Sequence, residues 1–371
     1  MANEEETAQN RRAGRNANLH RANTEKNDEF YTTYEEVEKE LNHYAKQFNN
    51  KVIYCNCDDH YGIGLGTPKS QFIKYLADNF EAFGIKKVIA THYEPEKTST
   101  MYILDKDNTG DGIICWEDIE EIKLKGNGDF RSDECIKLLQ QADIVITNPP
   151  FSLFREYVAQ LYQYNKKFLI IGNMNAITYK EIFPLIKENK LWFGYGFNRS
   201  MVFKTQYKNT LEANRKFVIS KGYNPDDNYI KTPAVCWFTN LENIKHQELI
   251  NTGKQYYGFE EMYPHYDNYD AIEVSEVKNI PMDYDGIMGV PITFLDKHNP
   301  EQFEIIGCAD YTGKYGSDWL CVGRIGETWM KKYREQGGRG HYTANMTSLV
   351  YYDNNGNAIP TFKRILIKRK K

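Results

Sequence analysis

The sequence predicts an α/β fold with a doubly wound, mostly parallel sheet, and three observations support this. Short apolar segments rich in Val and Ile recur at 51–56, 87–91, 143–147 and 167–172. The segments between them carry apolar residues at helical spacing. Polar residues follow the strand segments, as expected where parallel strands present their carboxyl ends to a ligand.

The first elements follow this alternation. Ordered structure is expected from Asp28, after a flexible basic arm at 1–27 that lacks apolar periodicity. The helix that follows has four apolar residues on one face: Val37, Leu41, Tyr44 and Phe48. After the first strand, a loop with alternating glycines precedes Thr67-Pro68, a favourable helix start. Gly84 is expected to end that helix.

Residues 97–127 interrupt the alternation and are expected to form a hairpin around 112–116 and 122–125. A helix at 133–141 restores the pattern, and another follows Phe151. Beyond Gly194 the rhythm changes, and residues 195–371 read as a second, less regular region. Its first β-like segments are 201–203, 217–220 and 234–239.

Charge is unevenly distributed, although the net charge of the 371 residues is only −4. Residues 11–21 hold four arginines and no acid, and from Arg324 to Lys371 eleven Lys or Arg accompany three acids. Basic ends of this kind suit phosphate backbones. For the last four residues a solvated tail is an equal alternative.

Other sequence features exclude several classes of protein. There is no apolar run long enough to span a membrane, and the N-terminus lacks a secretory pattern. Seven scattered cysteines make no disulfide framework, so a reducing cytoplasm is expected. Cys55 and Cys57 have no matching second pair and the histidines show no helical pairing with carboxylates. We therefore expect no metal site.

The segment at 143–151 is the most informative part of the sequence. A β-branched strand runs into Asn148-Pro149-Pro150-Phe151, a rigid turn that presents an amide, a carbonyl and an aromatic ring. The amide oxygen of Asn148 and the Pro149 carbonyl could accept both hydrogens of an adenine N6 amine. Phe151 could stack on a base that has left its helix. Because a sulfonium donor carries a good leaving group, positioning and electrostatics suffice for methyl transfer.

Acidic residues near the ends of the strands suit an adenosine-containing donor. Glu94, after the second strand, could accept from both ribose hydroxyls. Asp129 could accept from the adenine amino group, and Asp58 or the backbone near it suits a methionine ammonium. Any one of these carboxylates could be an ordinary solvated strand end.

Three rival functions remain open from these residues. A methyltransferase acting on RNA adenines or on another amine would use the same turn. A catalytically inactive nucleic-acid-binding relative would keep the basic ends. A nucleotide-binding oxidoreductase would need a glycine fingerprint that this chain lacks.

Several stretches resemble the EcoRI-type adenine-specific DNA methyltransferases, and together they cover most of the chain. They are 28–32, 52–59, 128–132, 148–160, 167–173, 179–190, 266–271, 289–294 and 364–368. The resemblance implies the fold of S-adenosylmethionine-dependent methyltransferases. It also implies methyl transfer from S-adenosylmethionine to N6 of an adenine flipped out of a specific double-stranded DNA site. The loop at 60–68 and the region 308–360 depart from the family pattern.

The resemblance also assigns roles to regions and residues. Residues 28–194 would form the S-adenosylmethionine-binding catalytic domain, and 195–371 a target-recognition region with a basic C-terminal tail. The residues that would bind the donor are Phe30, Tyr31, Thr32, Asp58, Glu94 and Asp129. The catalytic turn would be Asn148, Pro149, Pro150 and Phe151.

DNA contacts are expected within 195–361, from basic and amide side chains. The candidates are Asn198, Arg199, Lys204, Arg215, Lys331, Lys332, Arg334 and Arg339. Double-stranded DNA is the expected partner. A functional pairing with a restriction endonuclease is a further possibility, and both monomer and dimer remain open.

Overall fold

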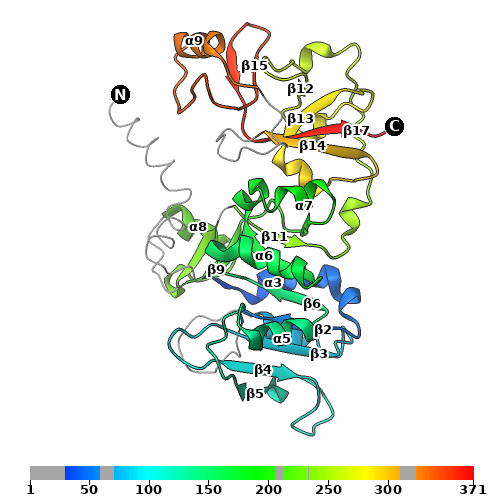
Figure 1. Ribbon diagram of the computed structural model, residues 1–371, viewed down its shortest axis with the longest axis vertical. Coiled ribbons are helices and arrows are strands. Elements are labelled where there is room, and N and C mark those ends of the chain that lie inside the picture. Colours follow the sequence, from blue (N-terminus) through cyan, green and yellow to red (C-terminus); the bar gives the residue numbers. More distant parts are fainter. Residues whose placement is uncertain (1–29, 59–70, 206–211, 233, 310–322) are drawn as a thin grey trace. The chain divides into compact units, whose positions relative to one another are not determined.

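An eight-stranded sheet is the main element of the computed structural model, which describes residues 30–58, 71–205, 212–232, 234–309 and 323–371 (Figure 1). Its strands, in spatial order, are β5 (Glu120–Lys123), β4 (Thr100–Leu104), β3 (Lys87–Thr91), β2 (Val52–Cys55), β6 (Ile144–Thr147), β7 (Lys167–Asn173), β11 (Val235–Thr239) and β8 (Trp192–Phe193). The four central strands, β3-β2-β6-β7, are parallel, while β4, β5 and β11 are antiparallel to their neighbours. The chain is thus an α/β protein, as the sequence predicts.

The order of the parallel strands reverses between β2 and β6. From β2 the chain moves outward to β3, and from β6 it moves outward in the opposite direction to β7. Such a switch point leaves a crevice at the carboxyl ends of the two strands, where α/β sheets bind ligands. Asp58 follows β2 and Asn148 follows β6, so two predicted site residues lie at this position.

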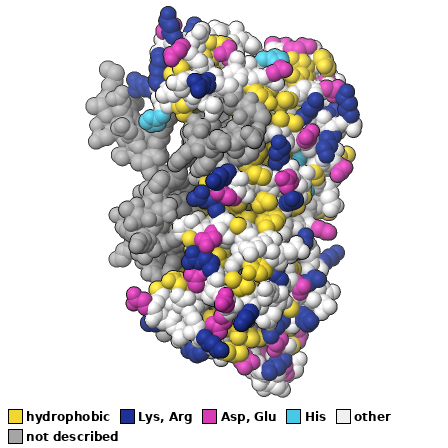
Figure 2. Space-filling view, in the orientation of Figure 1, with side chains coloured by type: hydrophobic (Ala, Val, Ile, Leu, Met, Phe, Trp, Pro, Cys, Tyr) yellow, Lys and Arg dark blue, Asp and Glu magenta, His cyan; other side chains and the backbone are white. Residues whose placement is uncertain are grey.

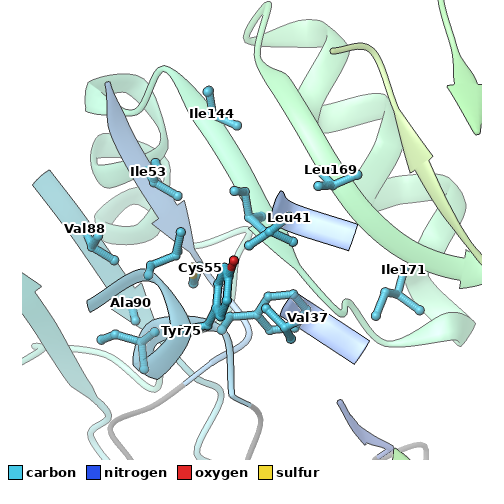
Figure 3. Close-up of a cluster of buried hydrophobic side chains, with 14 of the residues drawn as sticks. Val37, Leu41, Ile53, Cys55, Tyr75, Val88, Ala90, Ile144, Leu169 and Ile171 are labelled. Atoms are coloured by element: carbon cyan, nitrogen blue, oxygen red, sulfur yellow. The ribbon is translucent and has the colours of Figure 1, made fainter. Parts of the chain in front are cut away.

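Helices cover both faces of the central sheet. One face packs on α3 (Tyr34–Leu41), the 3-10 helix η1 (Asn42–Phe48) and α4 (Phe72–Asp78), and Figure 3 shows side chains of this core. The four apolar residues predicted to share a helix face are all fully buried there. The other face packs on α5 (Asp133–Gln141) and α6 (Phe154–Gln163), where the Phe154 ring lies 4.9 Å from that of Phe238.

The structure corrects two local predictions about the elements around the eight-stranded sheet. The hairpin pairs β4 with β5, and 112–116 forms no strand, because Asp107 and Asp118 bind backbone N–H groups of the intervening loop. A backbone amide held by a side chain cannot join a strand ladder. The helix expected to end at Gly84 ends at Asp78, and Gly84 (φ +63°) lies in the turn that follows.

A smaller sheet joins the N-terminal segment to the middle of the chain. It has the order β1 (Tyr31–Thr32), β9 (Met201–Lys204), β10 (Tyr229–Thr232), and α8 (Glu212–Ser220) packs on β10. The prediction of a strand at 217–220 is wrong, because these residues form the last turns of α8. Three consecutive apolar residues fit either pattern, and in the structure only Val218 of them is buried.

The chain divides into two units by contacts, and the division does not follow the sequence in order. The first unit includes the described residues up to Ala176 together with Phe193–Glu242, and the second comprises Ile177–Trp192 and Asn243–Lys371. Residues 195–242, expected to belong to the recognition region, therefore pack in the first unit. The reason is the pairing of β11 with β7 over the full length of β11.

The second unit has its own sheet, in the order β12 (Ile272–Glu273), β13 (Ile287–Pro291), β17 (Arg364–Arg369), β14 (Phe303–Ala309). A β15–β16 hairpin (Val350–Tyr352, Ala358–Pro360) and the helices α7 (Phe183–Lys187) and α9 (Glu327–Glu335) complete it. Glu273 is buried and accepts hydrogen bonds from Arg364 and from the Tyr266 hydroxyl. Tyr266, Gly289 and Arg364, from three of the stretches that resemble the family, are thus close together. Gly289 has no Cβ, and the Tyr266 ring occupies the space that a Cβ would need.

Two further observations concern the described part of the chain. Its six cysteines, from Cys55 to Cys308, are free. None of its helices combines the length and the apolar character needed to cross a bilayer.

His298 in the second unit makes the stability depend on pH. The ring is 2% exposed, and burial lowers its pKa from 6.5 to about 4. Between these values the unfolded chain binds more protons than the folded chain, so stability falls as the pH is lowered. We expect His298 to account for a loss of about 2 kcal/mol between pH 7 and pH 5. Urea unfolding of native and His298→Gln chains at both pH values measures it, and equal losses in the two chains would contradict this assignment.

Candidate active site

The predicted catalytic turn lies where β6 leaves the sheet. All four residues of β6 are buried, and Asn148, Pro149 and Pro150 lead directly into the 3-10 helix η3 (Phe151–Leu153) and then α6. The turn is closed by a hydrogen bond from the Leu153 amide to the Pro150 carbonyl, 3.0 Å. A buried strand on one side and a helix on the other thus fix the position of Asn148.

The side chain of Asn148 is oriented by one contact. Its Nδ2 donates to the backbone carbonyl of Phe30 at 2.6 Å. Its Oδ1 is buried and has no hydrogen-bond partner among the residues that the structure describes. Because a buried acceptor without a partner is unfavourable, this oxygen is available to a donor group of a ligand. The Phe30 carbonyl thus determines which end of the amide faces the free position.

Phe151 lies beside Phe30 at the same corner. Their rings are nearly parallel, 23° apart, with centroids 6.1 Å apart, and Phe30 also meets Phe203 edge-on. From the sequence, Phe30 was expected beside the donor only because of the family resemblance. Its contact with Asn148 joins residues 118 positions apart, and no local sequence signal could have revealed it.

Asp58, three residues after the end of β2, is held by two hydrogen bonds to backbone groups. Asp58 is buried, its amide donates to the Thr91 carbonyl, and its Oδ2 accepts from the Ile73 amide at 2.7 Å. Asp58 therefore binds the first turn of α4, a structural contact that the sequence did not predict. Burial raises the pKa of the neighbouring Cys57 to about 12. The Cys57 thiol is therefore protonated at neutral pH and is a poor nucleophile.

Glu94 and Asp129 are both hydrogen-bonded to Asn127. The Asn127 carbonyl accepts from the Glu94 amide at 2.8 Å, and its side-chain oxygen accepts from the Asp129 amide at 3.2 Å. Gly128 between them has φ +77°, and a Cβ there would lie 2.0 Å from the His92 carbonyl oxygen. Only glycine fits this close approach.

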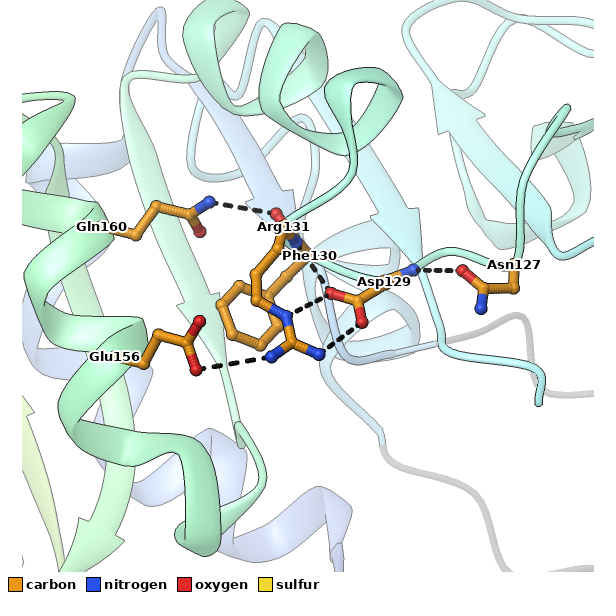
Figure 4. Close-up of polar contacts among 6 residues, drawn as sticks. All are labelled: Asn127, Asp129, Phe130, Arg131, Glu156 and Gln160. Carbon is orange, nitrogen blue, oxygen red and sulfur yellow. Dashed lines mark hydrogen bonds and ion pairs between the residues drawn. The ribbon is translucent and has the colours of Figure 1, made fainter.

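The carboxylate of Asp129 is chelated by Arg131 (Figure 4). The Nε and terminal nitrogen of Arg131 donate to its two oxygens at 2.9 and 2.7 Å, and this pairing lowers the pKa of Asp129. Arg131 also reaches Glu156 at 3.4 Å, and Gln160 donates to the Phe130 carbonyl at 3.2 Å. Sequence reasoning missed Arg131, although its position two residues after Asp129 was a usable signal.

The eight predicted DNA contacts are distributed over both units. On the face shown in Figure 2, Lys and Arg side chains are interspersed with Asp and Glu, so basic charge alone marks no DNA-binding surface on that face. Arg215 pairs with Asp226 at 2.9 Å, and Arg199 lies 3.9 Å from the buried Glu40. Arg334 donates to three backbone carbonyls, those of Gly338, Gly340 and Tyr342, which gives it a structural role at the end of α9.

Two further basic candidates, Lys331 and Lys204, make weaker contacts. Lys331 lies 4.0 Å from Glu335, and Lys204 lies over the Tyr229 ring. The basic arm at 1–27 and the glycine-alternating loop lie outside the described residues. Within the described ranges, no group of three His, Cys, Asp or Glu side chains is arranged to hold a metal ion.

Comparisons with known proteins identify the family of this chain. A family described as "Adenine-specific methyltransferase EcoRI" matches residues 18–370. The type II methyltransferase M.EcoRI of Escherichia coli is 48% identical over 304 residues, which cover 78% of this chain and 88% of the relative. M.MpnI of Mycoplasma pneumoniae is 41% identical, with coverage of 78% and 85%. No solved structure matches the chain. The chain therefore belongs to the EcoRI family of adenine-specific methyltransferases.

Proposed function

We propose that this enzyme transfers a methyl group from S-adenosylmethionine to N6 of an adenine extruded from a specific site in duplex DNA, with Asn148–Phe151 as the catalytic turn. The observation that carries the proposal is the state of the Asn148 amide. One end is held by Phe30 and the other is a buried oxygen without a partner in the described structure.

The chemistry follows from that geometry. The N6 lone pair of adenine is delocalised into the ring, which makes the amine a poor nucleophile. Hydrogen bonds from N6 to the Asn148 oxygen and the Pro149 carbonyl would favour a pyramidal nitrogen with its lone pair available. Phe151 would stack on the extruded base. A fixed acceptor needs no reorganisation as the charge develops, which is the source of electrostatic catalysis.

The donor would lie at the switch point between β2 and β6. Phe30, Tyr31 and Thr32 would border it, Glu94 would accept from the ribose hydroxyls, and Asp129 would accept from the adenine amino group. The segment at Asp58 would face the methionine end. S-Adenosylmethionine supplies an electrophilic methyl on a sulfonium. The hydrogen bonds through Asn127 support this assignment, because they fix Glu94 and Asp129 in one loop system.

Sequence recognition would come from parts of 195–371, with the basic C-terminal tail on the phosphate backbone. Relatives of this chain are named type II methyltransferases. On that basis we propose a functional pairing with a restriction endonuclease that cuts the same site when it is unmodified.

Methyl transfer to defined substrates tests the proposal. The purified chain is incubated with methyl-labelled S-adenosylmethionine and either unmodified duplex DNA or RNA. The nucleic acid is then digested to nucleosides, which are separated and identified by mass spectrometry. We expect N6-methyldeoxyadenosine from duplex DNA at one sequence context. Label mainly in RNA would favour the RNA alternative, and DNA binding without transfer would indicate an inactive relative.

Asp129→Asn tests the donor site. We expect the affinity for S-adenosylmethionine to fall about tenfold or more, because a hydrogen bond to a charged acceptor contributes roughly 1.5–3 kcal/mol. Calorimetric titration with the donor measures the change. Asp133→Asn, at the exposed start of α5, is the matched control and should bind the donor as the native chain does. Equal affinities in all three chains would remove Asp129 from the donor site.

A further inference from the structure

We propose that Lys204, Lys221 and Lys231 form a phosphate-binding surface on the small sheet β1-β9-β10 and the end of α8, and that this surface holds the DNA backbone beside the extruded adenine. The inference rests on the proposed function, since it takes duplex DNA as the ligand. Only Lys204 of the three was a sequence candidate. We call these three residues the lysine surface.

Aromatic rings hold all three ammonium groups in place. Lys231 Nζ lies 4.6 Å from the centre of the Phe217 ring, and Lys221 Nζ lies 5.6 Å from the same ring. Lys204 Nζ lies 5.6 Å from the centre of the Tyr229 ring. The rings order these long side chains without neutralising them, because a π face attracts a cation but carries no net charge. The lysine surface is therefore partly organised before any ligand arrives.

The charges of the lysine surface are not balanced by neighbouring carboxylates. Among the described residues, none of the three has an Asp or Glu oxygen within ion-pairing distance. On α8 itself, by contrast, Lys216 lies 3.4 Å from Glu212 and Arg215 lies 2.9 Å from Asp226. Two ammonium groups near one phenyl ring repel each other, and a nearby anion lowers that repulsion. The phosphates of a nucleic acid supply such anions at regular spacing.

The position of the lysine surface connects it to the catalytic turn. Lys204 in β9 pairs with Tyr31 in β1, and it also pairs with Tyr229 in β10. Directly opposite residues of antiparallel strands share a sheet face, so Tyr31, Lys204 and Tyr229 lie on one face. Residue 30, the one before Tyr31, provides the carbonyl that orients Asn148. One strand thus joins the lysine surface and the catalytic amide within the same unit.

This connection gives the lysine surface a specific task. Phosphate contacts set the register of a protein on DNA without reading its sequence. Extruding a nucleotide rotates it about its backbone, and the flanking phosphates must then be held. Lysines fixed to the sheet that orients Asn148 would hold those phosphates at a constant distance from the amide oxygen. The alternative is that the lysines only cover the Phe217 and Tyr229 rings.

The salt dependence of DNA binding distinguishes these two roles. Each phosphate contact contributes about 0.9 to the slope of log affinity against log salt. We expect the full-length variant K204Q/K221Q/K231Q to lose about 2 to 3 from that slope, and each single Lys→Gln variant to lose up to about 1. Titration of a fluorescent duplex at several salt concentrations measures the slope. Donor binding by calorimetry should remain unchanged.

Lys216→Gln is the matched control, because Lys216 lies on the same helix but is paired with Glu212. Its slope should equal that of the native chain. If the triple variant keeps the native slope, the lysine surface does not bind phosphates and the proposal is wrong. If the triple variant does not fold, native slopes in all three single variants lead to the same conclusion. If the native chain methylates duplex DNA, that failure leaves the proposed function standing. If the native chain neither binds nor methylates duplex DNA, both proposals are wrong.

Discussion

Replacing Asn148 with alanine is expected to slow methyl transfer by at least about 10²–10³-fold, the usual effect of removing one fixed group that stabilises a transition state. Alanine removes the buried oxygen that we assign to the adenine amine and leaves the proline-rich turn in place. Single-turnover transfer to a duplex containing the recognised site measures the effect. Donor affinity should stay close to the native value, because we assign the Asn148 oxygen to the adenine that accepts the methyl group and not to the donor.

Two companion variants separate chemistry from orientation. Asn148→Asp keeps an oxygen at this position but cannot donate to the Phe30 carbonyl, so its activity should also be low. Asn79→Ala is the control, because the Asn79 amide likewise donates to a backbone carbonyl, that of Tyr75, but at the end of α4. It should transfer methyl groups at the native rate. Native activity in Asn148→Ala would refute the assignment of the catalytic turn.

Gly128→Ala is expected to damage both stability and donor binding. The residue has φ +77°, and an added Cβ would lie 2.0 Å from the His92 carbonyl oxygen and 2.9 Å from Ser99 Oγ. Left-handed backbone costs about 1–2 kcal/mol for a residue with a Cβ, and forced repacking costs about 1–3 kcal/mol more. We expect the free energy of unfolding in urea to fall by about 2–5 kcal/mol. Donor affinity should fall as well, because the backbone around Gly128 also positions Glu94 and Asp129.

Comparison with Gly112→Ala isolates the steric part of this effect. Gly112 has a similar φ of +88°, but a Cβ there meets nothing within 4 Å. This variant should lose only the conformational contribution, about 1–2 kcal/mol, and bind the donor normally. If the two variants lose the same free energy of unfolding, the close approach to His92 has no energetic weight.

The sequence by itself determined the central part of the fold. The strands β2, β3, β6 and β7 lie where contiguous β-branched segments predicted them, and α5 has the predicted bounds. These elements are short and apolar on both faces or strongly periodic, so their pattern is local and survives packing. The strand-turn-helix at Asn148 is likewise local, since prolines restrict the backbone whatever surrounds them.

Tertiary structure decided the features that join distant residues. The Phe30 carbonyl orients Asn148, β11 adds to β7, and the Arg364–Glu273 pair links β17 with β12 in the second unit. The spacing of apolar residues along the sequence does not predict such contacts, because each depends on how separate elements pack. Packing also determined that the apolar residues 217–219 form part of α8 and not a strand. It likewise determined which lysines have no carboxylate nearby. A sequence shows which side chains are charged, but only the folded chain shows which of those charges are already paired.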